Sequence, residues 1–223
     1  MRRDLAAVID HTLLRPDAVP PDFERLCAEA AHYNLGAICV NSTHVRRCRE
    51  LLGSSGVKVV ATAGFPLGAA SAIAKAAEAC QAVRDGADEI DMVCQIGDLK
   101  SGQERAFIED IRKVVGAAEG RVVKVILETC LLSDDEKRQG ALWVRQAGAA
   151  FVKTSTGFSV GGATEKDVRL LRGEVGPDFG VKAAGGIREA EGADRMIAAG
   201  ANRLGTSAGV AIVTEYREGD AGY

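Results

Sequence analysis

Aromatic residues are scarce in this sequence, and neither sign of charge dominates it. Aromatic side chains make up 4% of the 223 residues, and 28 basic residues against 31 acidic ones leave a net charge of −3. Few aromatic rings leave few surfaces on which bases could stack. The balanced charge gives no basic surface for a phosphate backbone. We therefore expect no nucleic-acid partner.

The sequence also lacks the spacings of metal sites and disulfide frameworks. Its six cysteines form no C-x-x-C pair, and the three histidines, His11, His32 and His44, are scattered. Such sites need regular spacings of Cys and His. We therefore predict that the cysteines are reduced thiols and that the protein binds no metal and no other cofactor. Reduced thiols are typical of the cytosol, so we expect a cytoplasmic location.

Long apolar runs are absent as well. No stretch approaches the ~20 apolar residues that a membrane helix needs. The apolar segment Leu5–Ile9 is too short for the core of a signal peptide. We expect no membrane partner.

Short apolar runs alternate with amphipathic stretches along the chain, and no linker divides it. Eight strand–helix units in 223 residues favour an α/β fold, a single-domain (β/α)₈ TIM barrel over residues 1–216. The segment "REGDAGY", residues 217–223, is predicted to be a flexible tail. The expected strands are Ile9–Leu13, Ala37–Val40, Lys58–Ala63, Glu89–Val93, Val122–Glu128, Phe151–Lys153, Val181–Ala183 and Arg203–Gly205. The expected helices are Pro21–Tyr33, Thr43–Leu52, Ser71–Arg84, Ser101–Ala117, Ser133–Ala147, Thr164–Leu171, Glu189–Ala199 and Ser207–Tyr216.

Three of the expected strands each contain a lysine, a residue that is rarely buried without a partner. Lys124, Lys153 and Lys182 are 29 residues apart (153 − 124 and 182 − 153), which is about one βα unit. They therefore occupy similar points on the fifth, sixth and seventh strands. Because side chains alternate between the faces of a strand, Asp91 and these lysines should converge inside the barrel.

Clustered lysines favour amine chemistry. Burial and like charges both lower the pKa of an ammonium group, and a neutral amine can attack a carbonyl to form a Schiff base. Lys153 and Lys182, beside the carboxylate of Asp91, thus become candidate catalytic residues. For Lys124 the choice stays open between a catalytic role and an ordinary ion pair with Glu128 or Asp91.

Glycine-rich segments follow the seventh and eighth strands. Gly185 and Gly186 precede Arg188 and a helix, and Gly205 lies beside Ser207 at the start of another helix. Loops at these two positions of a barrel frequently bind phosphate, because backbone amides can approach the anion. The sequence therefore predicts a small phosphorylated substrate that carries a carbonyl.

Eight motifs resemble the deoxyribose-phosphate aldolase family. They are "IDHTLL" (9–14), "AICVN" (37–41), "GFPLG" (64–68), "GADEIDMV" (86–93), "KVILET" (124–129), "FVKTSTGF" (151–158), "VKAAGGIR" (181–188) and "RLGTSAG" (203–209). The resemblance spans nearly the whole chain. It implies a metal-free class I aldolase that reversibly cleaves 2-deoxy-D-ribose 5-phosphate to acetaldehyde and D-glyceraldehyde 3-phosphate. It also implies that the chain can form a homodimer.

The resemblance further implies roles for individual residues. Lys153 would form the Schiff base, Lys182 would lower its pKa, and Asp91 would relay protons through a water. The terminal Tyr223, which some members share, would assist proton abstraction. Where some members have a lysine after "TSTG", this chain has Phe158, which removes one phosphate contact. The implied supporting residues are Asp10, Thr12, Lys124 and Thr156, and the implied phosphate site is Gly157, Gly185, Gly186, Arg188, Gly205 and Ser207.

Two alternative functions remain open. One is another Schiff-base sugar-phosphate aldolase or a transaldolase. The other is a non-catalytic barrel that binds sugar phosphates, which would keep the glycine loops but need neither Lys153 nor Lys182. A metal-dependent aldolase is disfavoured, because the three histidines do not cluster.

Overall fold

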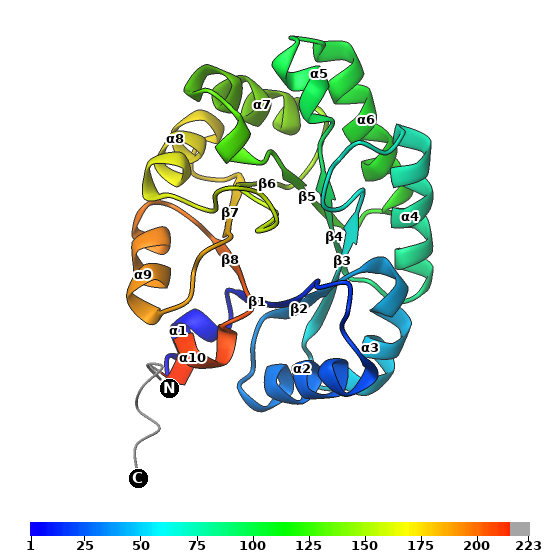
Figure 1. The fold of residues 1–223 in the computed structure, drawn as a ribbon, viewed down its shortest axis with the longest axis vertical. Helices are drawn as coiled ribbons and strands as arrows, with labels where there is room; N and C mark the ends of the chain where they lie inside the picture. Colours follow the sequence, from blue (N-terminus) through cyan, green and yellow to red (C-terminus); the bar gives the residue numbers. More distant parts are fainter. Residues whose placement is uncertain (215–223) are drawn as a thin grey trace.

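The structure is a computed structural model that describes residues 1–214. Over these residues, eight parallel strands close into a barrel, each strand pairing with the next and β8 with β1. Figure 1 shows the helices arranged as a ring outside the strands. The predicted (β/α)₈ barrel is confirmed. The strands are β1 Ile9–Leu13, β2 Ala37–Val40, β3 Lys58–Ala63, β4 Glu89–Val93, β5 Val122–Ile126, β6 Phe151–Lys153, β7 Gly180–Ala184 and β8 Arg203–Thr206.

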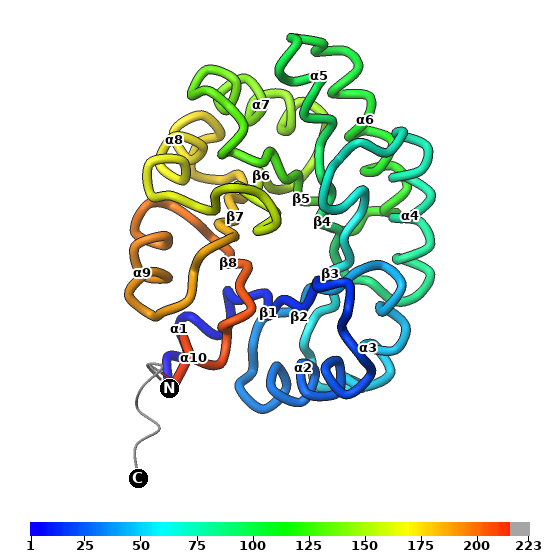
Figure 2. The backbone as a smooth tube through the Cα atoms, in the orientation of Figure 1, coloured from blue at the N-terminus to red at the C-terminus, as the bar shows by residue number. Residues whose placement is uncertain are grey.

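The helices follow the strands in sequence, and two short ones were missed by the sequence analysis: α1 before β1 and α5 after β4. In Figure 2, α1 lies beside α10, where the Arg2 N–H donates to the Val213 carbonyl at 2.7 Å. The helices are α1 Arg3–Ala6, α2 Pro20–His32, α3 Val45–Leu52, α4 Ala72–Arg84, α5 Ile96–Lys100, α6 Glu104–Ala117, α7 Asp134–Gln146, α8 Glu165–Val175, α9 Ala190–Ala198 and α10 Gly209–Thr214, with 3₁₀ turns at η1 Ser42–His44 and η2 Thr129–Leu131. None of the helices in this described part is long and apolar enough to cross a membrane.

Several predicted boundaries are wrong by a few residues. Strand β5 ends at Ile126 rather than Glu128, because Glu128 adopts a left-handed conformation with φ of 59°. Helix α8 continues to Val175, one turn beyond the predicted Leu171, and buries that valine. The predicted tail 217–223 and the end of the last predicted helix lie outside the described residues.

The alternation of side chains along the strands divides the interior into two layers. Ile90, Met92, Val123 and Val125 belong to the large apolar core between strands and helices. The opposite faces of β4 and β5 carry Glu89, Asp91 and Lys124, all buried inside the barrel. This division is the one that the sequence pattern predicts.

Candidate active site

Asp91 on β4 accepts hydrogen bonds from three buried lysines. Its Oδ1 lies 2.8 Å from Lys124 Nζ, while its Oδ2 lies 2.6 Å from Lys153 Nζ and 2.7 Å from Lys182 Nζ. The strand register explains this geometry, because Asp91 pairs with Lys124 and Lys153 pairs with Lys182 on adjacent strands. The structure thus brings together the four side chains that alternation predicts to converge.

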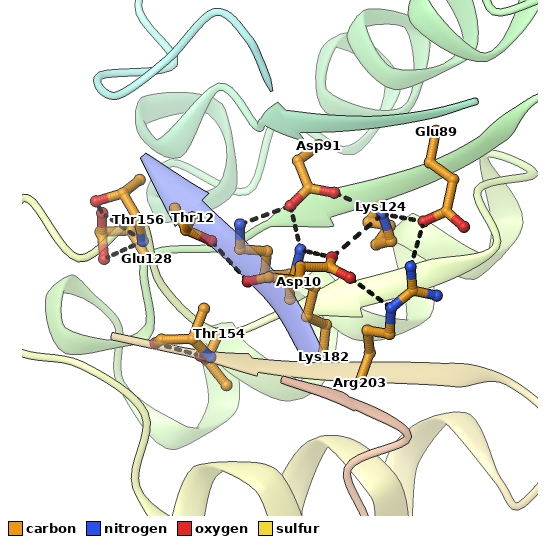
Figure 3. A network of polar contacts seen from close by, with 12 residues as sticks. Asp10, Thr12, Glu89, Asp91, Lys124, Glu128, Thr154, Thr156, Lys182 and Arg203 are labelled. Carbon is orange, nitrogen blue, oxygen red and sulfur yellow. Dashed lines mark hydrogen bonds and ion pairs between the residues drawn. The ribbon is translucent and has the colours of Figure 1, made fainter. Parts of the chain in front are cut away.

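The charged network continues beyond these four residues (Figure 3). Lys182 also donates to Asp10, whose Oδ1 lies 2.5 Å from Arg203 Nε. Glu89 Oε2 lies 2.7 Å from Lys124 Nζ and 3.1 Å from Arg203 Nη2. All seven residues are connected by ion pairs. We call them the interior ion cluster: Asp10, Glu89, Asp91, Lys124, Lys153, Lys182 and Arg203.

Glu89 and Arg203 were not identified as site residues from the sequence. A signal was present, because Glu89 lies two residues before Asp91 and Arg203 two before Gly205, so each shares the inward face. The open choice of partners for Lys124 is also resolved. Lys124 pairs with Asp91 and Glu89, whereas Glu128 accepts a hydrogen bond from Thr156.

The interior ion cluster shifts the pKa values of Lys153 and Lys182 in opposite directions. Burial lowers the pKa of Lys153, Asp91 opposes this effect, and the neighbouring Lys182 reinforces it. Burial also disfavours the ammonium form of Lys182, but Asp10 and Asp91 outweigh it and raise the pKa of Lys182. Lys153 is therefore the better nucleophile of the two, while Lys182 remains charged.

Asp91 is ionised in this arrangement. Burial disfavours its charge, but Lys124, Lys153 and Lys182 outweigh burial and hold the pKa of Asp91 well below its ordinary value. A carboxylate that accepts hydrogen bonds from three lysine side chains is a proton acceptor and an electrostatic anchor. It does not supply the first proton of a reaction.

A pocket of about 340 Å³ opens where strands β1, β6, β7 and β8 end, and Lys153 lines it. Asp10, Asp91, Lys124 and Lys182 do not line this pocket but are buried around the Lys153 amine. The residues predicted for phosphate and substrate support that line the pocket are Thr12, Thr156, Gly157, Gly185, Gly186, Arg188, Gly205 and Ser207.

The loops after β6 and β7 approach each other backbone to backbone. Gly185 has a φ of 91°, and a Cβ atom there would lie 3.0 Å from Gly162 Cα. The Ala163 N–H donates to the Gly185 carbonyl at 3.0 Å. Glycine is required at this approach, because any side chain would separate the two loops.

Gly205 has a second role that the sequence did not indicate. A Cβ atom at this position would lie 3.0 Å from Ala184 Cβ and 3.1 Å from Lys182 Cε. Gly205 therefore makes room for the Lys182 side chain as well as lining the pocket.

Phe158 packs against the loop after β3. Its ring meets that of Phe65 edge to face, with the centroids 5.2 Å apart. Phe65 belongs to the "GFPLG" segment after β3, so this contact joins that segment to the loop after β6, where Phe158 lines the pocket. Thr12 and Thr156 are fixed by local hydrogen bonds, Thr12 to the Asp10 carbonyl at 2.9 Å and Thr156 to Glu128.

Cys39 on β2 and His11 on β1 lie on opposite sides of the barrel wall. Cys39 packs inside the barrel with Leu14, Ala37 and Val60, and burial raises the pKa of its thiol to about 11. His11 faces away from the cluster, with its Nε2 2.8 Å from Glu29 Oε2.

Comparison with known proteins agrees with this geometry. The family model described as "DeoC/LacD family aldolase" matches residues 5–214. The chain belongs to this aldolase family. It is therefore a carbon–carbon lyase, as the sequence motifs imply.

Individual relatives span nearly the full chain. The chain is 54% identical over 214 residues to deoxyribose-phosphate aldolase 1 of Bacillus licheniformis, covering 96% of each chain. It is 54% identical over 210 residues to the deoxyribose-phosphate aldolase of Coprothermobacter proteolyticus, covering 94% of this chain and 96% of the relative. It also resembles the solved structure of the tetrameric enzyme of that name from Aeropyrum pernix, with a TM-score of 0.90 and 35% identity over 97% of this chain and 92% of that one.

The three carboxylates of the cluster make an acid-sensitive core. Burial disfavours their charge, but the surrounding cations outweigh it and lower the pKa values of Asp10, Glu89 and Asp91. A lowered pKa contributes stability that is present above the unfolded value near 4 and is lost as the pH falls below it. We expect the free energy of unfolding, measured by urea titration, to fall steeply below about pH 4.

The variant Asp91→Asn tests whether the carboxylates of the cluster cause this loss of stability in acid. It should be less stable than the wild type at pH 7, because three lysines lose their shared partner, and its stability should depend less on pH in the acid range. Asp17→Asn is the control, since its side chain is 79% exposed and paired only at the surface. An acid dependence of Asp91→Asn as steep as that of the wild type would contradict the assignment.

Proposed function

We propose that the chain reversibly cleaves 2-deoxy-D-ribose 5-phosphate to acetaldehyde and D-glyceraldehyde 3-phosphate through a Schiff base on Lys153. One observation carries the proposal: a single pocket contains Lys153 and the glycine loops after β7 and β8. An amine and an anion site in one pocket suit a sugar with an aldehyde at one end and a phosphate at the other. The names of the relatives from Bacillus and Coprothermobacter support the same substrate.

The neutral amine of Lys153 attacks C1 of the open-chain sugar, and loss of water gives an imine. A base takes the proton of the C3 hydroxyl. The C2–C3 bond then breaks, its electron pair moves into the protonated imine, and glyceraldehyde 3-phosphate leaves. The remaining enamine takes a proton at C2, and water hydrolyses the resulting imine to release acetaldehyde and the free lysine.

The surrounding residues divide the proton transfers. Asp91 accepts protons through a water, consistent with its ionised state. Lys182 stays protonated and lowers the pKa of Lys153. Asp10 and Lys124 hold these two groups through ion pairs. Thr12 and Thr156 line the pocket as positioning residues.

The phosphate is bound by backbone amides of Gly157, Gly185, Gly186 and Gly205, with Arg188 and Ser207 at the rim of the same pocket. Because Phe158 replaces a lysine, the backbone amides carry more of the binding. The homodimer and the cytoplasmic location expected from the sequence stay predictions. A size measurement in solution and fractionation of cells would test them.

Lys153 should be the residue that forms the imine. Borohydride reduction in the presence of acetaldehyde, followed by peptide mass mapping, should place the modification on Lys153. Lys153→Met should abolish cleavage and trapping while keeping the fold, since its aliphatic chain fills a similar space. Lys166→Met, whose side chain is 72% exposed, is the matched control and should behave as the wild type. Trapping on Lys124 or Lys182 would refute the assignment.

The loop after β7 should bind the phosphate. Gly186→Ala should raise the KM for the phosphorylated substrate by about tenfold or more, a loss of ~1.4 kcal/mol, and change the KM for 2-deoxyribose much less. Gly176→Ala is the control. Gly186 and Gly176 both have a positive φ, 81° and 77° respectively, and open space where a Cβ atom would lie, but Gly176 lies outside the pocket. Equal effects of Gly186→Ala on both substrates would show that this glycine serves folding alone.

Tyr223 lies outside the described residues, and its role stays a prediction. Deleting this residue alone should slow hydrogen exchange at the acetaldehyde-derived carbon while borohydride trapping continues. An unchanged exchange rate would remove Tyr223 from the mechanism.

A further inference from the structure

The interior ion cluster contains unequal numbers of positive and negative groups. Within residues 1–214 it joins four basic side chains, Lys124, Lys153, Lys182 and Arg203, to three carboxylates. Lys58 adds a fifth cation beside Glu89, but its side chain is 52% exposed and therefore solvated by water. By contrast, the side chains of the interior ion cluster itself are at most 12% exposed. A buried excess of one positive charge is costly.

The excess can be removed only by a lysine, because the guanidinium of Arg203 does not lose its proton in proteins. Lys182 contacts both Asp10 and Asp91. Lys124 contacts Glu89 at 2.7 Å and Asp91 at 2.8 Å. Lys153 contacts one carboxylate, Asp91, and shares its Oδ2 atom with Lys182. Lys153 is the least compensated of the three, so it is the group that loses its proton.

Arg203 is the group that creates the excess. It donates to Asp10 and to Glu89, the carboxylates that would otherwise compensate Lys182 and Lys124 alone. The positive charges of Lys182 and Lys124 are then compensated mainly by Asp91. The negative charge of Asp91 therefore stabilises a proton on Lys153 less strongly. Arg203 lines no part of the substrate pocket, so it has no direct access to the substrate.

We propose that Arg203, which lies on β8 outside the substrate pocket, keeps the amine of Lys153 neutral by adding a positive charge to the interior ion cluster, and that Glu89 limits this effect. Arg203 and Glu89 are positioning residues, which act through Asp10, Lys182 and Lys124. The proposal rests on Lys153 as the nucleophile and adds the source of its reactivity.

Within residues 1–214, the titratable groups around Lys153 lie on five strands and on the segment after β5. Asp91 on β4, Lys124 on β5 and Lys182 on β7 belong to the cluster, as does Asp10 on β1. Cys39 on β2 remains a thiol at neutral pH, because burial raises its pKa to about 11. Glu128 binds Thr156 and Cys130 instead of a lysine. The balance therefore depends on the seven cluster residues.

Two substitutions change the balance in opposite directions. Arg203→Met leaves three lysines against three carboxylates, so Lys153 should keep its proton to a higher pH. Asp10 and Glu89 keep Lys182 and Lys124 as partners, so no carboxylate is left unpaired. Glu89→Gln leaves four cations against two carboxylates, so Lys153 should lose its proton at a lower pH. Arg203→Lys keeps the positive charge and should restore the wild-type behaviour.

The test is competitive acetylation of the protein with acetic anhydride over a range of pH, with the reactivity of Lys153 read from its peptide by mass spectrometry. The midpoint for Lys153 should rise by about one pH unit in Arg203→Met and fall in Glu89→Gln. The acid limb of kcat/KM should shift in the same directions, because it reports the essential base of the free enzyme. Arg121→Met is the control, since Arg121 contacts the Ala87 carbonyl rather than a carboxylate.

The labelling result does not depend on catalysis, so it separates this proposal from the proposed function. Wild-type protein without aldolase activity would refute the function while the labelling still measured Lys153. Unshifted midpoints, or shifts of the same sign in Arg203→Met and Glu89→Gln, would overturn the role of Arg203. If Arg203→Met does not fold, the other two variants decide. Glu89→Gln must then lower the midpoint for Lys153, and Arg203→Lys must keep the wild-type midpoint. The absence of either result would overturn the role of Arg203.

Discussion

One carboxylate oxygen, Oδ2 of Asp91, is shared between the amines of Lys153 and Lys182, at 2.6 Å and 2.7 Å. This oxygen stabilises both lysines in the barrel interior, because an unpaired buried ammonium group is expensive. Yet one oxygen cannot fully compensate two cations. Lys182 has Asp10 as a second partner and stays charged, whereas Lys153 has no second carboxylate partner among residues 1–214. The shared oxygen therefore positions both amines and makes them chemically different.

The barrel makes this sharing possible through its register. Asp91 is in register with Lys124, and Lys153 is in register with Lys182. Lys153 is also in register with Ile126, which lies two residues after Lys124 and on the same face of β5. Gly205 on β8 leaves room for Lys182, and the loop after the same strand lines the substrate pocket. The fold thus connects the proposed nucleophile, its charged neighbour and the proposed anion site through three consecutive strands.

Much of this arrangement could be predicted from the sequence. The alternation of "EIDMV" and "VVKVILE" places Asp91 and Lys124 inside the barrel, and the glycine loops are found where the motifs place them. The choice between Asp91 and Glu128 as the partner of Lys124 could not be made from the sequence, because strand alternation gives the face of Glu128 but not the left-handed turn that directs it to Thr156. The importance of Arg203 was also missed, since a charge balance requires every member of the network to be known. The short helices α1 and α5 were missed because four or five residues carry too little periodicity.

The central claim is that the cluster forces one particular lysine to be neutral. It is tested most directly by an NMR pH titration of the lysine side chains, with ¹³C at the ε carbons and resonances assigned by single Lys→Met variants. Lys153 should titrate well below the ordinary lysine pKa of about 10.4, while Lys182 should stay protonated throughout the accessible range. Titration of Lys182 before Lys153, or an ordinary pKa for Lys153, would contradict the account.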